Sequence, residues 1–292
     1  MQIPCVLKRL GAALALASLI GSAQAVLLYE NSAGNDMASF TLSGTQVQAY
    51  TQNKGNGRGI VVVGDTIYYT TADSNNVFTR RVSDNVDTGV AFSIAGTSGL
   101  QAISYDGTNF WVGDYSGTNH AYLVSSSTGA ILSTISLVNA TGFYDGLEYF
   151  NGKLIANRFD GGFGGPQHYD VYSLTGALLT SAFIDTTGHG NGTGIAFDGT
   201  NFLVSDIFSN RITRWDGTTG AFIDAITLQG SHGEVEDLSV DFAGRSDTCG
   251  GPGQPPCVIG AIPEPETYAL MLGGLALLGA VTRRRKALAQ KS

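Results

Sequence analysis

The feature of this chain that most constrains its fold is a repeat of 43 to 48 residues in its middle. Each repeat opens with an alternating apolar segment, a tight turn that contains Gly, and a second alternating segment. These openings read IVVVGDTIYYTT, ISYDGTNFWVGD, LEYFNGKLIANR and IAFDGTNFLVSD, and they start at Ile60, Ile103, Leu147 and Ile195. Asn-Gly and Asp-Gly supply the positive φ angles that hairpin turns require. A second strand–turn–strand pair follows, so the repeating unit is four antiparallel strands.

A period of this length with four strands is typical of a β-propeller blade. Four blades are complete, starting near residues 58, 99, 144 and 193. A fifth first strand, LSVDFAG at 238–244, has no partners after it, whereas VLLYE, MASFTLS and TQVQAYT near residue 26 lack a first strand. We therefore predict an all-β fold, a propeller of five four-stranded blades in residues 26–245, closed by pairing the two ends. Six blades stay open if residues 246–262 contain strands, although their Gly, Pro and Cys content indicates a linker.

One segment also carries a family resemblance. FLVSDIFSNRITRWDGTTGAFI, residues 202–223, resembles the NHL and related surface-protein propeller repeats, in which a strand ending in Asp precedes an Asn-Arg-Ile strand. The segment WVGDYSGTNHAYLVSSSTGAIL keeps the Asp and lacks the Asn-Arg. Propellers serve as lectins, hydrolases and scaffolds, so this resemblance predicts a fold and no particular activity.

The N-terminus predicts export. Lys8 and Arg9 precede an apolar run from Leu10 to Ile20, and Ala23-Gln24-Ala25 forms a small-x-small cleavage site. This order is typical of a secretory signal peptide, residues 1–25, that signal peptidase removes. Cys5 precedes the apolar run, so we interpret it as lost with the signal.

The C-terminus predicts a membrane segment. Residues 267–282 contain no charged side chain, and a helix of that length covers about 24 Å. A bilayer core is about 30 Å thick, so this would be a short transmembrane helix. Arg283, Arg284, Arg285 and Lys286 follow at once, which favours a cytoplasmic end and a short cytoplasmic tail at 287–292.

Pro263-Glu264-Pro265, the apolar stretch and the basic cluster together resemble the PEP-CTERM sorting signal of Gram-negative bacteria, here residues 263–286. The resemblance implies recognition by an exosortase that processes the tail. It also implies transport across the inner membrane, a transient anchor there, and final location at the outer surface or in extracellular, polysaccharide-rich biofilm matrix.

Composition narrows the class of partner. Residues 26–262 hold 22 Asp or Glu against 9 Lys or Arg, a net charge of −13. Such a domain repels phosphate backbones, so nucleic acid is excluded as a partner. Cys249 and Cys257 bracket GGPGQPP, and in an oxidising compartment we expect them to form a disulfide. No histidine or further cysteine lies nearby in sequence, which disfavours zinc.

In a propeller, the loops that lead into each first strand meet at one end of the central channel, together with the loops between strands two and three. The polar and aromatic residues expected there are Arg58, Gln101, Tyr144, Asp145, His189, Asn191, His232, Glu234, Glu236 and Asp237, with Asp114, Arg158 and Asp206 at the ends of second strands. We interpret Asp114 and Asp206 as structural, and His189 as a neutral loop histidine without a role. Oxygen ligands suit Ca²⁺, so the candidate metal ligands are Asp145, Asn191, Glu236 and Asp237.

Three functional hypotheses follow. The leading one is a non-catalytic binding or structural module at the cell surface or in matrix, which uses exposed Tyr and Trp to bind polysaccharide or a surface protein. The alternatives are a Ca²⁺-dependent hydrolase of the gluconolactonase-like propeller kind, or a glycosidase with two facing carboxylates. The sequence contains no Gly-x-Ser-x-Gly elbow, HExxH or Walker loop, so we assign no catalytic residues.

Overall fold

The structure is a computed structural model, and it describes residues 26–140, 143–162, 165–230 and 233–240. These residues belong to one compact unit, Val26–Ile259. The signal peptide, the linker with its cysteines, the sorting signal, the membrane segment and the tail predicted from the sequence lie outside the described residues, as does His232. No helix in the described ranges is long and apolar enough to cross a membrane.

Twenty strands make up the described unit. They are β1 (Leu27–Ser32), β2 (Asp36–Thr41), β3 (Gln46–Thr51), β4 (Gly57–Val63), β5 (Thr66–Thr71), β6 (Ser74–Arg81), β7 (Asp87–Ser93), β8 (Leu100–Tyr105), β9 (Phe110–Asp114), β10 (His120–Val124), β11 (Ile131–Ser136), β12 (Leu147–Phe150), β13 (Lys153–Asn157), β14 (His168–Ser173), β15 (Leu178–Asp185), β16 (Gly192–Phe197), β17 (Asn201–Asp206), β18 (Arg211–Asp216), β19 (Phe222–Thr227) and β20 (Val235–Val240).

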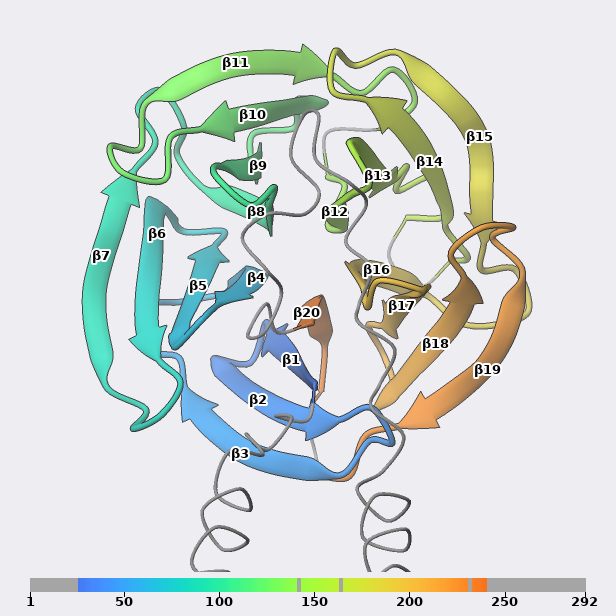
Figure 1. Cartoon of the computed structure of the whole chain (residues 1–292), viewed down its shortest axis with the longest axis horizontal. Coiled ribbons are helices and arrows are strands. Elements are labelled where there is room, and N and C mark those ends of the chain that lie inside the picture. The colour runs from blue at the N-terminus through green and yellow to red at the C-terminus, as the bar shows by residue number, and fades with distance from the viewer. Residues whose placement is uncertain (1–25, 141–142, 163–164, 231–232, 241–292) are drawn as a thin grey trace, which may run out of the picture. The chain divides into compact units, whose positions relative to one another are not determined.

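The strands form five antiparallel four-stranded sheets around a common centre (Figure 1). Their orders from the centre outward are β20-β1-β2-β3, β4-β5-β6-β7, β8-β9-β10-β11, β12-β13-β14-β15 and β16-β17-β18-β19. We number these sheets as blades one to five. The predicted five-bladed propeller is confirmed, and residues 246–262, on which the six-bladed alternative depended, lie outside the described residues.

The ring closes through the two ends of the domain, as the sequence predicts. β20 pairs antiparallel with β1, with Leu28 opposite Val240 and Asn31 opposite Asp237. The first strand of this blade covers Val235–Val240, so it begins three residues before the predicted start at Leu238. Closure by distant segments removes free edges at the join.

The innermost strands approach one another too closely for most side chains. The residues just before Ile60, Ile103, Leu147, Ile195 and Leu238 are Gly59, Ala102, Gly146, Gly194 and Asp237. A Cβ added to Gly194 would lie 2.2 Å from the Cα of Asp237 in the next blade, and one on Gly146 would lie 2.3 Å from the Thr193 carbonyl oxygen. Glycine at this position in three of the five blades therefore lets neighbouring blades meet closely.

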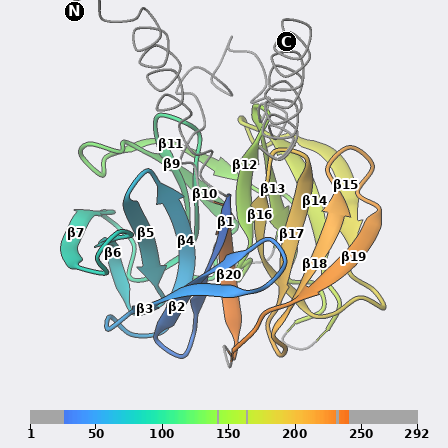
Figure 2. The ribbon, with the colours of Figure 1, turned by 60° about the horizontal axis from the view of Figure 1, so that its bottom comes forward.

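The strands run between two faces of the ring (Figure 2). We call the face with the turns between first and second strands the turn face. There, Asp106 Oδ1 accepts the backbone N–H groups of Thr108 and Asn109, and Asp198 does the same for Thr200 and Asn201. These turns are structural, as predicted.

The opposite face, formed by the loops into each first strand and between second and third strands, is the loop face. β1 begins and β20 ends at the turn face, because Leu28 and Val240 are paired there. The described chain therefore enters and leaves the propeller on the turn face.

The core lies between neighbouring blades. Trp111 packs with Tyr144, Leu147 and Tyr172, and Trp215 packs with Phe202 in a separate cluster. Both tryptophans are 2% exposed. The expectation that Trp is available for a ligand is wrong, because both rings fill space between blades.

Candidate site at the axis of the propeller

Five equivalent residues lie where the first strands begin at the loop face. They stand two positions before Ile60, Ile103, Leu147, Ile195 and Leu238, and they are Arg58, Gln101, Asp145, Thr193 and Glu236. The pairing register shifts at this point in β4, β8, β16 and β20, which marks a β-bulge. A bulge redirects the side chain of the extra residue, which is why bulges recur beside functional sites.

Three of the five side chains meet at the axis. Arg58 Nη1 lies 2.6 Å from Glu236 Oε1 and 3.7 Å from Asp145 Oδ1. Arg58 belongs to blade two and Asp145 to blade four, so this contact spans non-adjacent blades across the centre of the ring. The guanidinium also lies 4.8 Å from the centre of the Tyr115 ring, and Nη2 donates to its hydroxyl at 3.4 Å. We call Arg58, Asp145 and Glu236 the axial triad.

The axial triad is almost completely buried, with side chains 3–6% exposed. Burial raises the pKa of Asp145 to about 6, although the Arg58 charge acts in the opposite direction. Burial and the neighbouring Asp145 charge raise the pKa of Glu236 to about 8. Burial alone would lower the pKa of Arg58, but Glu236 and Asp145 raise it above its usual value. One guanidinium thus compensates two carboxyl groups that bind protons readily near neutral pH.

The other two residues of the set bond to backbone. Thr193 Oγ1 donates to the Val235 carbonyl at 2.9 Å. The amide nitrogen of Gln101 donates to the backbone carbonyl of Asp114 at 3.0 Å and to that of Tyr144 at 2.9 Å. These contacts join neighbouring blades and leave the axial triad as the charged part of the set.

Two further carboxylates hold the first strands together. Asp237 Oδ2 accepts the N–H of Ile60 at 3.1 Å and Oδ1 accepts that of Ile195 at 3.3 Å. Glu148 accepts the Ser104 hydroxyl at 2.7 Å and the Phe197 N–H at 3.2 Å. Burial raises the pKa of Asp237 well above its usual range. Sequence reasoning missed Glu148, because an alternating strand gives no sign that a polar residue will face the axis.

The four predicted metal ligands are only partly brought together. Asp145 and Glu236 meet at Arg58, whereas Asp237 bonds backbone N–H groups. The Asn191 carbonyl accepts the Ile207 N–H at 3.2 Å, and no hydrogen bond links Asn191 to the other three within the described part. Over those same residues, no group of three or more His, Cys, Asp or Glu is placed to hold a metal ion. The donor set does not fit Ca²⁺, since Arg58 occupies the space between the two carboxyl groups.

Asp114 and Asp206 have the structural roles predicted for them, whereas His189, expected to have no role, packs against an outer strand. Asp114 accepts the Tyr122 hydroxyl at 2.6 Å and the Thr118 hydroxyl at 2.9 Å, and Asp206 accepts the Phe208 N–H at 3.3 Å. The His189 ring stacks on Phe222 with centroids 3.9 Å apart. These contacts stabilise loops and outer strands.

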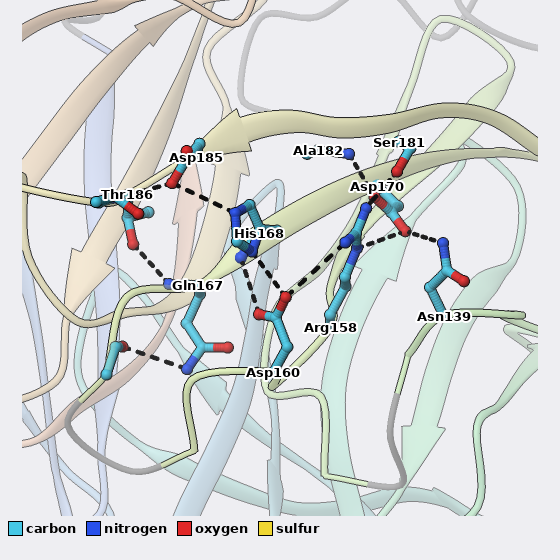
Figure 3. A network of polar contacts seen from close by, with 12 residues as sticks. Asn139, Arg158, Asp160, Gln167, His168, Asp170, Ser181, Ala182, Asp185 and Thr186 are labelled. Atoms are coloured by element: carbon cyan, nitrogen blue, oxygen red, sulfur yellow. Dashed lines mark hydrogen bonds and ion pairs between the residues drawn. The ribbon is translucent and has the colours of Figure 1, made fainter.

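Arg158, also a candidate, belongs to a network in blade four (Figure 3). Its guanidinium donates to both oxygens of Asp170, at 2.9 and 2.7 Å. Asp170 also accepts Asn139 Nδ2 at 2.8 Å and the Ala182 N–H at 2.6 Å. Burial opposes ionisation of Asp170, but these donors hold its pKa below the usual value. The network fixes the loop after β13 against β14 and β15.

His168 extends this network toward solvent (Figure 3). Its Nδ1 lies 2.7 Å from Asp160 Oδ2, and its Nε2 lies 3.5 Å from Asp185 Oδ1. The imidazole therefore joins the loop before β14 to the end of β15.

Three aromatic rings form a row on the loop face, and no pattern in the sequence predicted it. Tyr115 and Phe143 have ring centroids 5.6 Å apart in an edge-to-face arrangement, and Phe143 and Phe159 are 6.2 Å apart. Tyr115 lies against Arg58, so the row starts at the axial triad. We call these three residues the aromatic row.

Comparison with known proteins identifies the tail. The family model of the PEP-CTERM protein-sorting motif matches residues 261–286. This motif implies an exported protein that is sorted through the cell envelope and processed by an exosortase.

The fold has relatives among solved structures. The chain is similar to a chain in the crystal structure of a Nidogen/Laminin complex, with a TM-score of 0.50 and 11% sequence identity. The match covers 74% of this chain and 97% of that chain. At this identity the likeness shows the fold alone. No curated protein matches the sequence.

Proposed function

We propose that this protein is a non-catalytic binding module, displayed at the surface of a Gram-negative cell or in its extracellular matrix. The observation that carries the proposal is the use of the axial carboxylates. Asp145 and Glu236 share Arg58, and Asp237 bonds the backbone of two other blades. Groups committed in this way to closing the ring are poor candidates for acid–base work on a substrate.

The end of the described propeller supports a binding role for the loop face. The last described strand, β20, ends at Val240 on the turn face, so the described chain does not leave through the loop face. The sorting motif follows in the sequence at 261–286. Surface polysaccharide and surface proteins are the two classes of ligand that an exported module would meet there.

The enzymatic alternatives lack matching observations in the described residues. A glycosidase needs an acid and a second carboxylate that flank a bound sugar. Asp145 and Glu236 are 4% and 3% exposed, so a sugar cannot reach between them in this conformation. A Ca²⁺-dependent hydrolase needs a metal where Arg58 now lies.

The test is turnover by the purified chain, with Ca²⁺ and with chelator, on lactones, phosphoesters and aryl glycosides. We expect no hydrolysis above the buffer rate, and retention of the protein on the surface or matrix of cells that export it. Hydrolysis that disappears in Glu236→Gln would overturn the proposal, and so would recovery of the protein only as a free, unattached species.

A further inference from the structure

The aromatic row presents ring surface to solvent. Phe143 is 42% exposed, and Tyr115 and Phe159 are half-buried. Three neighbouring aromatic rings on one face, next to buried polar groups, are typical of ligand-binding surfaces. The row runs from the axial triad toward blade four.

Backbone and side-chain contacts hold the row in place. The Arg58 guanidinium packs on Tyr115, and its own position is fixed by Glu236 and Asp145. Phe159 has a φ of 57°, which is rare for a bulky residue and costs backbone strain. Strain of this kind persists where the surrounding structure requires it, and it is concentrated in ligand clamps. The row is therefore a preorganised surface.

The chemistry around the row selects the ligand. Ser116 and Gly117 are exposed beside Phe143, and a Cβ on Gly117 would lie 3.8 Å from its ring. The Ser116 hydroxyl donates to Asp114 and keeps its lone pairs as acceptors, to which a sugar hydroxyl can donate. The C–H face of a sugar ring packs on the electron-rich face of an aromatic ring, while its hydroxyl groups bond to polar side chains at the edge.

Charge excludes one large class of sugars. Residues 26–262 carry a net charge of −13, which repels polysaccharides that carry carboxylate or sulfate. The two carboxyl groups of the axial triad, at the inner end of the row, are compensated by Arg58. They therefore give no excess charge that would demand a cationic sugar.

A protein partner fits less well. A stable protein interface needs about 20 to 30 residues on each side, with an apolar core. In the described loops of this face, the strongly exposed large apolar residues are few, namely Val138, Phe143 and Phe208. A short row of rings in polar, Gly-rich loops matches a narrow chain better than a broad protein surface.

We infer that Tyr115, Phe143 and Phe159 form a binding site for a neutral saccharide chain, with sugar rings packed along the row. This inference rests on the proposed function and deepens it by naming the site and the class of ligand. Tyr115 is held by Arg58, so the axial triad positions the inner end of the site.

The experiment is calorimetric titration of the purified chain with hexasaccharides of neutral glucose, mannose, galactose and xylose, and with galacturonate and glucosamine hexamers as charged comparators. The test variant is Phe143→Ala. Phe143→Tyr keeps a ring at this position, and Leu132→Ala removes another exposed apolar side chain, 54% exposed, from β11 of blade three. Because Phe143 is substantially exposed, Phe143→Ala should fold.

We expect a neutral hexasaccharide to bind, with affinity about tenfold weaker in Phe143→Ala and unchanged in Phe143→Tyr and Leu132→Ala. Equal affinity in Phe143→Ala, tighter binding of a charged hexamer, or binding of no neutral hexamer would overturn the inference. If the chain hydrolyses no substrate and stays attached to cells but binds no neutral saccharide, this site is ruled out and the proposed function still stands. Saturable binding of a purified surface protein at the same rings would overturn the saccharide assignment and make the aromatic row a protein-binding site.

Discussion

The carboxylate of Asp237 accepts a hydrogen bond from the backbone nitrogen of Ile60 at 3.1 Å, across 177 residues of sequence. Its second oxygen accepts the N–H of Ile195. The inner edge of a propeller's first strands has no further strand to satisfy its backbone groups, and buried N–H groups without a partner are costly. One side chain from the closing strand thus serves two other blades.

Replacing Asp237 by alanine should therefore destabilise the whole ring. Two buried N–H groups would lose their acceptor, which predicts a fall in the free energy of unfolding of about 2–5 kcal/mol. Urea unfolding followed by circular dichroism measures this. Asp84→Ala is the control, because Asp84 pairs with Arg81 at the surface and its loss should cost about 0.5 kcal/mol or less. Equal midpoints for the two variants would contradict the role given to Asp237.

The close approach of the first strands gives a second prediction. In Gly194→Ala the new methyl group would meet the Asp237 backbone at 2.2 Å, so β16 and β20 would have to separate. We expect a loss of at least about 2 kcal/mol in thermal or urea unfolding. Gly233 has open space around its Cβ position, and its φ is not in the left-handed region. Gly233→Ala should unfold like the unsubstituted chain, and a matching loss there would refute the steric explanation.

The fold was predictable because a unit of four strands repeats along the sequence. Four blades show a Gly-containing turn between two alternating strands, and the unpaired strands at the two ends predicted how the ring closes. The one error of position, at the start of β20, arose because Val235, Glu236 and Asp237 do not look like an alternating strand. Their side chains are all buried because they lie near the axis of the propeller, so they do not show the alternation of a strand with one buried face.

The site was less predictable. Sequence reasoning placed Arg58, Asp145 and Glu236 at the correct end of the propeller, although Arg58 and Glu236 lie in β4 and β20 instead of in loops. It could not show that Arg58 would lie between the two carboxyl groups, since the contact with Asp145 joins non-adjacent blades. Glu236 and Asp237 are neighbours in the sequence, yet the bulge directs the Glu236 side chain to Arg58 and the Asp237 side chain to backbone N–H groups. The aromatic row depends on three loops from two blades, and no local pattern reports such proximity.

The axial triad predicts a pH dependence. The folded-state pKa values of Asp145 and Glu236, about 6 and about 8, exceed their usual values of 3.8 and 4.5. The folded chain therefore binds more protons than the unfolded chain between about pH 4 and pH 8, and stability falls as pH rises through that window. We expect a lower urea midpoint at pH 8 than at pH 5. Glu236→Gln removes the group with the higher pKa, so the decline from pH 6 to pH 8 should be shallower in that variant, and an unchanged slope would contradict the assignment.

Calcium provides an independent check on the alternative enzymatic function. A bound ion at a concentration of about one hundred times its dissociation constant would add about 2.7 kcal/mol of stability, or a melting shift of about 5 °C or more. Because Arg58 fills the space between Asp145 and Glu236, we expect the melting temperatures in millimolar Ca²⁺ and in chelator to agree within about 1 °C. A large shift that Asp145→Asn abolishes would restore the predicted ligand set.

The most direct test of the account is the stability of Arg58→Ala. If the axial triad holds the ring together, removing its cation leaves two buried carboxyl groups without compensation. The free energy of unfolding at pH 8 should then fall by about 3–5 kcal/mol, and the loss should shrink at pH 5, where both groups bind protons. Unchanged or increased stability at pH 8 would mean that Arg58 is kept at the axis for a ligand or a reaction, and the structural reading of the triad would be wrong.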